Sequence, residues 1–150
     1  MLQKAVLADA KPIQELISSF AQKKVMLPRA LNYVYENIRD FWVWKENGKV
    51  LGCCALHVIG WEGLAEVKSL SVHESLHKKG IGKLLVEQCL EEARELGLTK
   101  VFALTFVPGF FAKVGFHEVT KESLPHKIWS DCIDCPFFPN CEEIAVLRAL

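Results

Sequence analysis

The chain has 150 residues, of which 51% are hydrophobic and 24% charged, a composition that favours one globular domain over residues 1–150. Its 18 basic and 18 acidic residues balance, so the charge predicts neither a nucleic-acid partner nor binding to an anionic membrane. No apolar run approaches the roughly 20 residues that span a bilayer, and the N-terminus lacks the apolar core of a signal peptide, so we expect a cytoplasmic protein.

The first part of the chain predicts a strand and two helices. Leu2 to Leu7 has the composition of a short strand. Asp9 can cap a following helix whose apolar side chains recur at helical spacing, namely Ile13, Leu16, Ile17 and Phe20. A second, shorter helix is expected from Pro28 to Ile38, because proline is favoured in the first helical turn.

The middle of the chain predicts an antiparallel meander. Segments 41–45 and 50–59 are rich in β-branched, aromatic and aliphatic residues, and the Asn47-Gly48 pair between them is a strong hairpin signal. A third strand is expected from Ala65 to Val72.

A long amphipathic helix is expected after Gly80, and Gly97 suits the position that ends it. Its predicted apolar stripe is made of Ile81, Leu84, Leu85, Cys89, Ala93 and Leu96. Its predicted outward face carries Lys83, Glu87, Glu91, Arg94 and Glu95.

Short elements complete the chain. We expect a strand at 100–106, a short helix at 108–114, and strands at 116–119 and 144–147. The resulting order of strands and helices predicts an α/β fold around a mixed sheet.

The most informative segment lies where the predicted meander meets the long helix. The strand ending at Val72 is followed by a basic, glycine-bearing loop, His77-Lys78-Lys79-Gly80-Ile81-Gly82-Lys83. Glycines let backbone N–H groups approach a ligand, and the first N–H groups of a helix can bind an anion, so this loop predicts a pyrophosphate site. The alternative is a solvated helix start with chance lysines. A dinucleotide-binding G-x-G-x-x-G motif is excluded, because Leu85 stands at the third glycine.

This loop resembles the coenzyme A loop of the GNAT acetyltransferase superfamily, Q/R-x-x-G-x-G/A. Gly80 and Gly82 match the two small residues, and His77 stands at the Q/R position. The later segment Phe110-Phe111-Ala112-Lys113-Val114-Gly115-Phe116 resembles the family's F-Y-x-x-x-G-F. The resemblance implies the GNAT fold, a mixed, mainly antiparallel sheet of six to seven strands flanked by about four helices. It also implies acetyl-coenzyme A as co-substrate.

Further segments are similar to the short bacterial N-acetylglutamate synthases within that superfamily. They are Leu27-Pro28-Arg29, Gly52-Cys53, Ala65 to Val72, Leu104-Thr105, Phe110-Phe111, Leu124-Pro125 with Lys127, and Asp131 to Glu143. Lys68 stands where that group carries arginine. This resemblance implies acetyl transfer to the α-amine of an amino acid, glutamate above all, in arginine biosynthesis, by an enzyme that can form a homodimer.

The resemblance and the chemistry together assign roles to the cofactor site. Backbone groups of Leu70, Ser71 and Val72 are expected to pair with the pantetheine arm, and the N–H near Leu70, exposed by a bulge, is expected to stabilise the oxyanion. Residues 77–83, that is His77, Lys78, Lys79, Gly80, Ile81, Gly82 and Lys83, are expected to hold the pyrophosphate. Phe111 takes the place of the tyrosine that often protonates the departing thiolate.

The amine site needs a base and cations. Glu66 is the candidate general base, with a strand carboxylate facing solvent or a lysine as the alternative. Arg29, Lys68 and Lys127, with Ser69 beside them, are the candidate ligands for a dicarboxylic substrate, and surface charges are the alternative.

Two other functions fit the same motifs. One is acetylation of a peptide, polyamine or other amine by the same chemistry. The other is a catalytically silent acetyl-coenzyme A sensor, for which Phe111 and His77 would be marks of decay.

The segment 126–143 contains three clustered cysteines, Cys132, Cys135 and Cys141. A structural zinc site takes four ligands, and a second cysteine or histidine pair is missing, although His126 could be a fourth ligand. We favour reduced thiols and no metal, with a disulfide or a metal site as alternatives.

Overall fold

The computed structural model describes residues 1–21, 29–61, 63–124 and 143–150. These residues form a seven-stranded sheet in the order β1-β2-β3-β4-β5-β7-β6. The strands are β1 (Leu2–Lys4), β2 (Phe41–Glu46), β3 (Lys49–Trp61), β4 (Leu64–Val72), β5 (Lys100–Thr105), β6 (His117–Val119) and β7 (Ile144–Ala149). The sheet confirms the predicted mixed α/β architecture.

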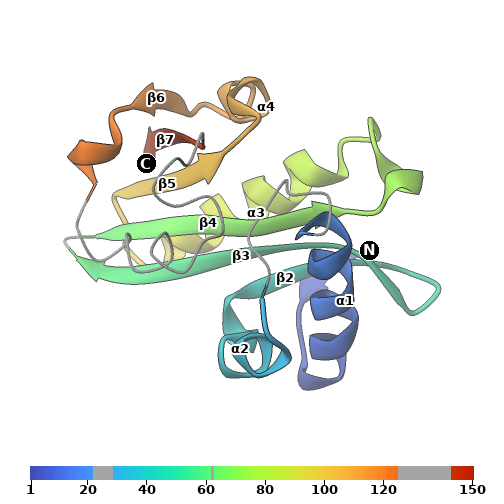
Figure 1. The fold of residues 1–150 in the computed structure, drawn as a ribbon. Helices are drawn as coiled ribbons and strands as arrows, with labels where there is room; N and C mark the ends of the chain where they lie inside the picture. The colour runs from blue at the N-terminus through green and yellow to red at the C-terminus, as the bar shows by residue number, and fades with distance from the viewer. Residues whose placement is uncertain (22–28, 62, 125–142) are drawn as a thin grey trace.

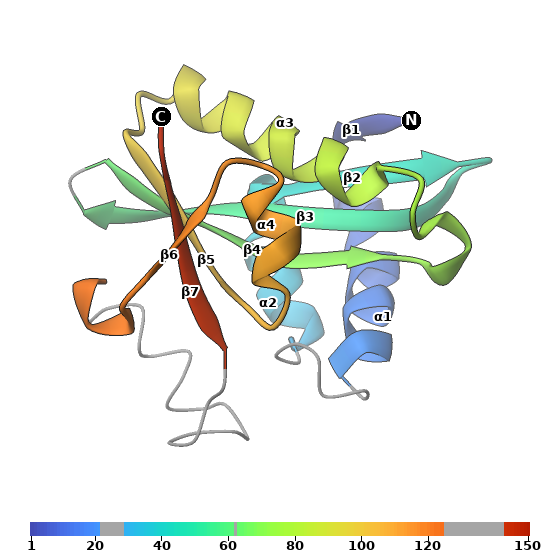
Figure 2. The same ribbon diagram turned by 90° about the horizontal axis from the view of Figure 1, so that it is seen from above.

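Helices cover both faces of this sheet. They are α1 (Ala10–Ala21), α2 (Leu31–Glu36), α3 (Ile81–Glu95) and α4 (Pro108–Ala112). Short 3-10 helices lie at Leu7–Asp9, Ile38–Asp40, Glu74–Leu76 and Lys121–Ser123. Helices α1 and α2 pack on one face, and α3 and α4 on the other (Figures 1 and 2). No helix in the described ranges is long and apolar enough to cross a bilayer.

The centre of the sheet changes from antiparallel to parallel pairing. Strands β4 and β5 are the parallel neighbours, whereas the other neighbouring pairs of described strands are antiparallel. Residues 64–66 of β4 lie opposite residues 100–102 of β5, and beyond these the two strands diverge (Figure 1). The second half of β4 therefore borders the place where the sheet splits.

Three apolar clusters stabilise this arrangement. The largest packs α3 and α4 on the sheet and includes Leu85, Val86, Leu90, Val101 and Phe111. A second packs α1 and α2 on the opposite face and includes Ile13, Ile17, Val34, Phe41 and Val43. The third lies over β5 and β7 and includes Leu64, Phe102, Leu124 and Ala145. Each cluster removes apolar surface from water, which is the main favourable term in folding.

The predicted hairpin is present. Asn47 and Gly48 adopt φ angles of 52° and 78°, as a type I′ turn requires at its two central residues. They join β2 to β3, which pairs in turn with β4, so the predicted meander is confirmed.

The buried face of helix α3 differs in part from the predicted stripe. Leu84 and Leu96 were expected to face the core, but they are 43% and 60% exposed, whereas Val86 and Leu90 are buried. The reason is that α3 crosses β2, β3 and β4, so the rows of residues four apart face the sheet. The five predicted outward residues are all exposed, which confirms that part of the prediction.

The C-terminus of α3 is closed as the sequence predicts. Gly97 lies at φ 83°, its N–H donates to the carbonyl of Arg94 at 3.0 Å, and Leu98 N–H donates to the carbonyl of Ala93 at 2.9 Å. These two hydrogen bonds form a Schellman motif.

Asp9 does not act as the N-cap that the sequence predicts. It ends the 3-10 helix Leu7–Asp9, and its buried carboxylate accepts a hydrogen bond from Val6 N–H at 2.9 Å and pairs with Lys45 at 2.7 Å. The carboxylate therefore joins the N-terminal segment to β2. The first strand ends at Lys4 and not at the predicted Leu7, because Leu7 belongs to the 3-10 helix.

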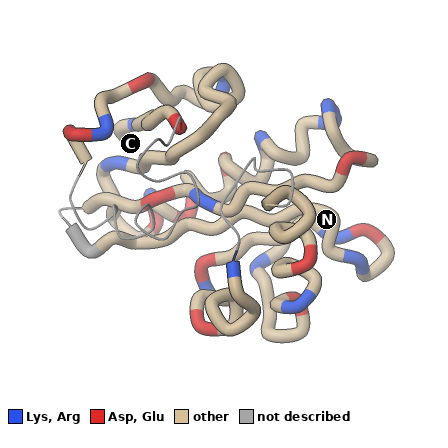
Figure 3. Tube along the Cα trace, in the orientation of Figure 1, with Lys and Arg blue, Asp and Glu red and all other residues tan. Residues whose placement is uncertain are grey.

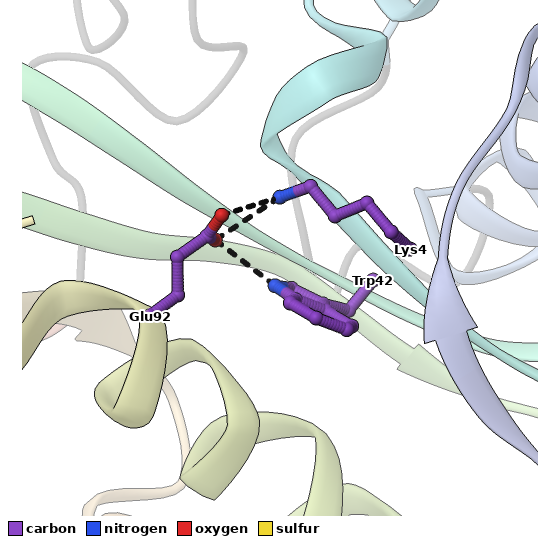
Figure 4. Close-up of polar contacts among 3 residues, drawn as sticks. All are labelled: Lys4, Trp42 and Glu92. Atoms are coloured by element: carbon purple, nitrogen blue, oxygen red, sulfur yellow. Dashed lines mark hydrogen bonds and ion pairs between the residues drawn. The ribbon is translucent and has the colours of Figure 1, made fainter. Parts of the chain in front are cut away.

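A polar contact ties the sheet edge to α3. Both carboxylate oxygens of Glu92 accept hydrogen bonds from the Lys4 ammonium, at 3.0 and 2.8 Å (Figure 4). One of the same oxygens accepts from the Trp42 indole N–H at 2.9 Å. The ammonium also lies 4.9 Å from the centre of the Trp42 ring. Glu92 therefore holds β1 and β2 against the helix.

Glu92→Ala is expected to lower the free energy of unfolding by about 1–2 kcal/mol, because a half-buried indole N–H loses its acceptor. For a domain of this size, that corresponds to a fall of roughly 2–8 °C in the thermal midpoint. Glu91→Ala is the matched control, since Glu91 lies on the exposed face and makes a longer contact of 3.4 Å with Arg94. Equal midpoints for the two variants in thermal denaturation would contradict this assignment.

Candidate active site

Strand β4 contains a bulge beside the divergence from β5. Cys53 of β3 lies opposite Ser71, but Ala55 lies opposite Lys68, so β4 has one extra residue between these pairs. Ser69 takes up the extra residue with a φ of 58°, and its carbonyl accepts from the Cys53 thiol at 3.4 Å. A bulge interrupts the ladder and redirects backbone groups. The structure thus has the predicted bulge next to Leu70.

The side chains of β4 near the bulge lie on two faces of the sheet, one apolar and one charged. Leu70 and Val72 pack towards the α3 face, with the largest apolar cluster. Glu66 and Lys68 lie on the opposite face, because their neighbours Ala65 and Val67 belong to the α3 cluster and side chains alternate along a strand. The predicted base and the predicted lysine ligand therefore share one face.

Arg29 and Lys68 meet around an aromatic ring. The Arg29 guanidinium carbon lies 4.7 Å from the centre of the Tyr33 ring, and the Lys68 ammonium lies 5.4 Å from it. The Arg29 carbonyl also accepts from the Gln14 side chain of α1 at 3.3 Å, which fixes the backbone there. Two of the predicted substrate ligands, from distant parts of the chain, are thus brought together.

The electrostatics of Lys68 follow from these neighbours. Burial and the Arg29 cation lower its pKa, but the Glu66 carboxylate and the hydrogen-bonded Tyr33 more than offset them, so the pKa of Lys68 is raised. A group with a raised pKa remains protonated as the pH rises through its ordinary value. Lys68 is therefore a permanent cation at physiological pH.

Sequence reasoning missed Tyr33, although it lies four residues after Arg29. It also missed a histidine and a carboxylate on the same face. His57 of β3 lies directly opposite Glu66, and its Nδ1 is 2.7 Å from a carboxylate oxygen of Asp40. No signal in the sequence pairs Asp40 with His57, because their contact depends on how β3 passes the 3-10 helix Ile38–Asp40.

The predicted pyrophosphate loop leads into the N-terminus of α3. Gly80 is the N-cap residue, at φ 79°, and no side chain caps this end of the helix. Space remains open around Gly80, and Lys78, Lys79 and Lys83 are exposed nearby. Figure 3 shows blue segments, which are Lys or Arg, in this loop. Uncapped N–H groups and cations suit a pyrophosphate, so the residues fit coenzyme A.

His77 holds the loop to the end of β4. Its Nε2 lies 2.8 Å from the carbonyl oxygen of Val72, which can only accept, so the ring donates this hydrogen bond. The His77 ring also lies 6.4 Å from the ring of Phe20, at the end of α1. His77 therefore positions the loop, and its predicted direct contact with the cofactor remains a prediction.

The two adjacent phenylalanines of α4 have different surroundings. Phe111 is buried and packs edge-on against Phe110 and Phe116. Phe110 is half-buried, and its ring is the nearest group to a Cβ built on Gly82, at 3.5 Å. Phe110 thus lies against the start of α3, and the expected contact of Phe111 with the cofactor remains a prediction.

Gly80→Ala is expected to weaken coenzyme A binding up to about tenfold, because an alanine at positive φ costs roughly 1–2 kcal/mol and the strain is relieved by moving the loop. Gly97→Ala is the matched control, since Gly97 also has positive φ and open space but lies at the far end of α3. Both variants should lose similar stability, and calorimetric titration should find weaker binding for Gly80→Ala alone. Equal affinities would contradict the assignment of the loop.

Several predictions concern residues outside the described ranges. Lys127, the cysteines 132, 135 and 141, and His126 all lie there. Within the described ranges, no group of three potential metal ligands is found. Cys53, Cys54 and Cys89 are free and buried, as expected, and burial raises the pKa of Cys53 to about 12, so this thiol stays protonated and unreactive.

Comparisons with known proteins identify the family of this chain. Residues 10–118 match the model of the Acetyltransferase (GNAT) family. An uncharacterised N-acetyltransferase of Chlorobaculum tepidum is 42% identical over 99% of this chain and 96% of its own length. An amino-acid acetyltransferase of Mycobacterium tuberculosis is 38% identical over 87% of this chain and 76% of its own.

Solved structures share the fold. The N-acetylglutamate synthase of Neisseria gonorrhoeae, complexed with coenzyme A and N-acetyl-glutamate, has a TM-score of 0.91 at 24% identity. The match covers all of this chain, which spans 35% of that protein's chain. A Mycobacterium tuberculosis protein in complex with CoA and NLQ has a TM-score of 0.86 at 30% identity, over 100% of this chain and 99% of that one. This chain belongs to the GNAT family and is an acetyl-coenzyme A-dependent N-acetyltransferase.

Proposed function

We propose that the enzyme transfers acetyl from acetyl-coenzyme A to the α-amine of an amino acid, with L-glutamate as the preferred substrate, in arginine biosynthesis. The observation that carries this proposal is the pair of cations around Tyr33, which lies on the same face as a buried carboxylate. Arg29 and Lys68 suit a substrate with two carboxylates, since one guanidinium and one ammonium can each hold a carboxylate group. The names of the amino-acid acetyltransferase relatives support the same substrate class.

Glu66 is suited to take the proton from the substrate ammonium. Only the neutral amine can attack the thioester, and a free α-amine is largely protonated at neutral pH. Glu66 is 9% exposed and lies at the last paired position of β4 before the divergence from β5. A carboxylate there adjoins the backbone that would pair with the pantetheine arm.

The backbone of β4 would supply the remaining chemistry. Acetyl-coenzyme A provides the activated thioester. The bulge redirects the N–H groups near Leu70, one of which would hold the oxyanion, and such a donor contributes roughly 10²–10³ in rate. The thiol of coenzyme A, with a pKa near 8.5, can leave as a thiolate without a protonating tyrosine.

A substrate panel tests this proposal. The protein is incubated with acetyl-coenzyme A and, in separate reactions, glutamate, glutamine, aspartate, polyamines and a short peptide, and thiol release is followed. The proposal predicts the highest kcat/KM for glutamate. A higher kcat/KM for the peptide or a polyamine would show that the amine is of another class. Thermal stabilisation by acetyl-coenzyme A without turnover of any amine would indicate a sensor.

A further inference from the structure

The geometry points to a proton relay behind the base: we propose that His57 and Asp40 carry to solvent the proton that Glu66 takes from the substrate ammonium. The inference rests on the proposed function of Glu66. Each turnover converts an ammonium and a thioester into an amide and a thiol, and releases one proton. That proton must leave a carboxylate that is itself 9% exposed.

The arrangement of the strands puts His57 within reach of Glu66. The two residues are direct cross-strand partners in the antiparallel β3–β4 pair. Side chains of such partners lie on the same face, with Cβ atoms about 4.5–5.5 Å apart. Glu66 is buried whereas the His57 side chain is 36% exposed, so the pair leads from the interior towards water.

Asp40 orients the histidine for this step. Its carboxylate accepts the Nδ1 proton of His57 at 2.7 Å, which leaves Nε2 as the nitrogen that can accept a proton. A carboxylate plays this part for histidine in other enzymes, where it fixes the tautomer without taking the proton.

The proton balance is complete without any further reactant. An ammonium N–H bond breaks as an O–H bond forms on Glu66. That O–H bond then breaks as an N–H bond forms on Nε2 of His57, and the imidazolium gives its proton to water or a buffer base. The second proton of the attacking nitrogen goes to the departing thiolate. Glu66 is then ionised again for the next turnover.

The charged groups around His57 permit this cycle. Asp40 faces it from the 3-10 helix Ile38–Asp40, and Glu66 faces it from β4. Lys68 lies on the same face of β4 and interacts with Glu66. Tyr33 of α2 lies next to Lys68, and the Arg29 guanidinium lies against the same Tyr33 ring.

Two variants and a chemical rescue test the relay, once the wild-type protein has been shown to acetylate an amine. His57→Gln is expected to lower kcat about 10²-fold, at the low end for general acid–base catalysis. Asp40→Asn should give a smaller loss. KM for acetyl-coenzyme A and the thermal midpoint should stay near their wild-type values. His117→Gln is the matched control, because His117 is exposed on β6.

Rescue separates a relay from a structural role. Added imidazole should raise the activity of His57→Ala at least tenfold, in proportion to the unprotonated fraction of the imidazole. It should not change the activity of His117→Ala. A kcat within twofold of wild type in both His57→Gln and Asp40→Asn would overturn the relay. A loss that imidazole does not restore would also overturn it. A wild-type protein without transferase activity would instead overturn the proposed function, and the relay with it.

Discussion

Glu66→Gln is expected to slow acetyl transfer by about 10²–10⁴-fold at neutral pH, the range for loss of a general base. The variant can use only the amine that is already neutral in solution. Its rate should therefore rise about tenfold per pH unit up to the pKa of the substrate amine, and its deficit should be largest at low pH. Steady-state kinetics from pH 6 to about 9.5 measure this.

The control for this variant is Glu118→Gln, an exposed carboxylate of β6. Both variants should bind acetyl-coenzyme A with wild-type affinity, because neither residue belongs to the pyrophosphate loop. A pH–rate profile of Glu66→Gln parallel to that of wild type would remove Glu66 from the role of base.

Lys68→Met is expected to raise KM for glutamate about 10- to 150-fold, since a hydrogen bond to a charged partner contributes roughly 1.5–3 kcal/mol. The methionine keeps the length of the side chain that packs near Tyr33. The effect should be much smaller for glutamine, whose side chain carries no charge, so the preference for glutamate should fall.

Lys68→Arg and Lys100→Met complete this test. Arginine preserves the charge and should keep most of the affinity. Lys100 is an exposed cation of β5, and its loss should leave KM unchanged. Equal losses for glutamate and glutamine in Lys68→Met would show that Lys68 supports the fold of the site and does not bind a substrate carboxylate.

Local signals were sufficient for most of the fold. Asn47-Gly48 predicted a turn that needs positive φ at both residues, and Gly97 predicted the end of α3, because few other residues adopt these conformations. The change of period from strand to helix after Gly80 located the loop that precedes α3. These features depend on residues that are close in the sequence.

The remaining features depend on long-range packing. The burial of Val86 and the exposure of Leu84 follow from the angle at which α3 crosses the sheet, which periodicity does not define. The contact of Asp9 with Lys45 likewise requires β2 to be in place. Sequence-based expectations of a cap or a stripe therefore fail where tertiary contacts provide a better partner.

The candidate site shows the same division. Glu66 and Lys68 were candidates because they lie on the strand that leads to a recognisable loop. Tyr33 and the Asp40–His57 pair were not, because an aromatic ring on a short helix and a histidine in an apolar strand are usually structural. These residues come together only in the folded chain, on the α2 face of the sheet, where four separate segments meet.

The most direct test is a mass measurement on one reaction: the purified protein with L-glutamate and acetyl-coenzyme A carrying a ¹³C-labelled acetyl group. The account predicts N-acetylglutamate with the label in its acetyl group, formed in proportion to enzyme and suppressed in Glu66→Gln. Consumption of the labelled acetyl-coenzyme A without formation of labelled N-acetylglutamate would contradict it. Formation of the product by Glu66→Gln at the wild-type rate would also contradict it.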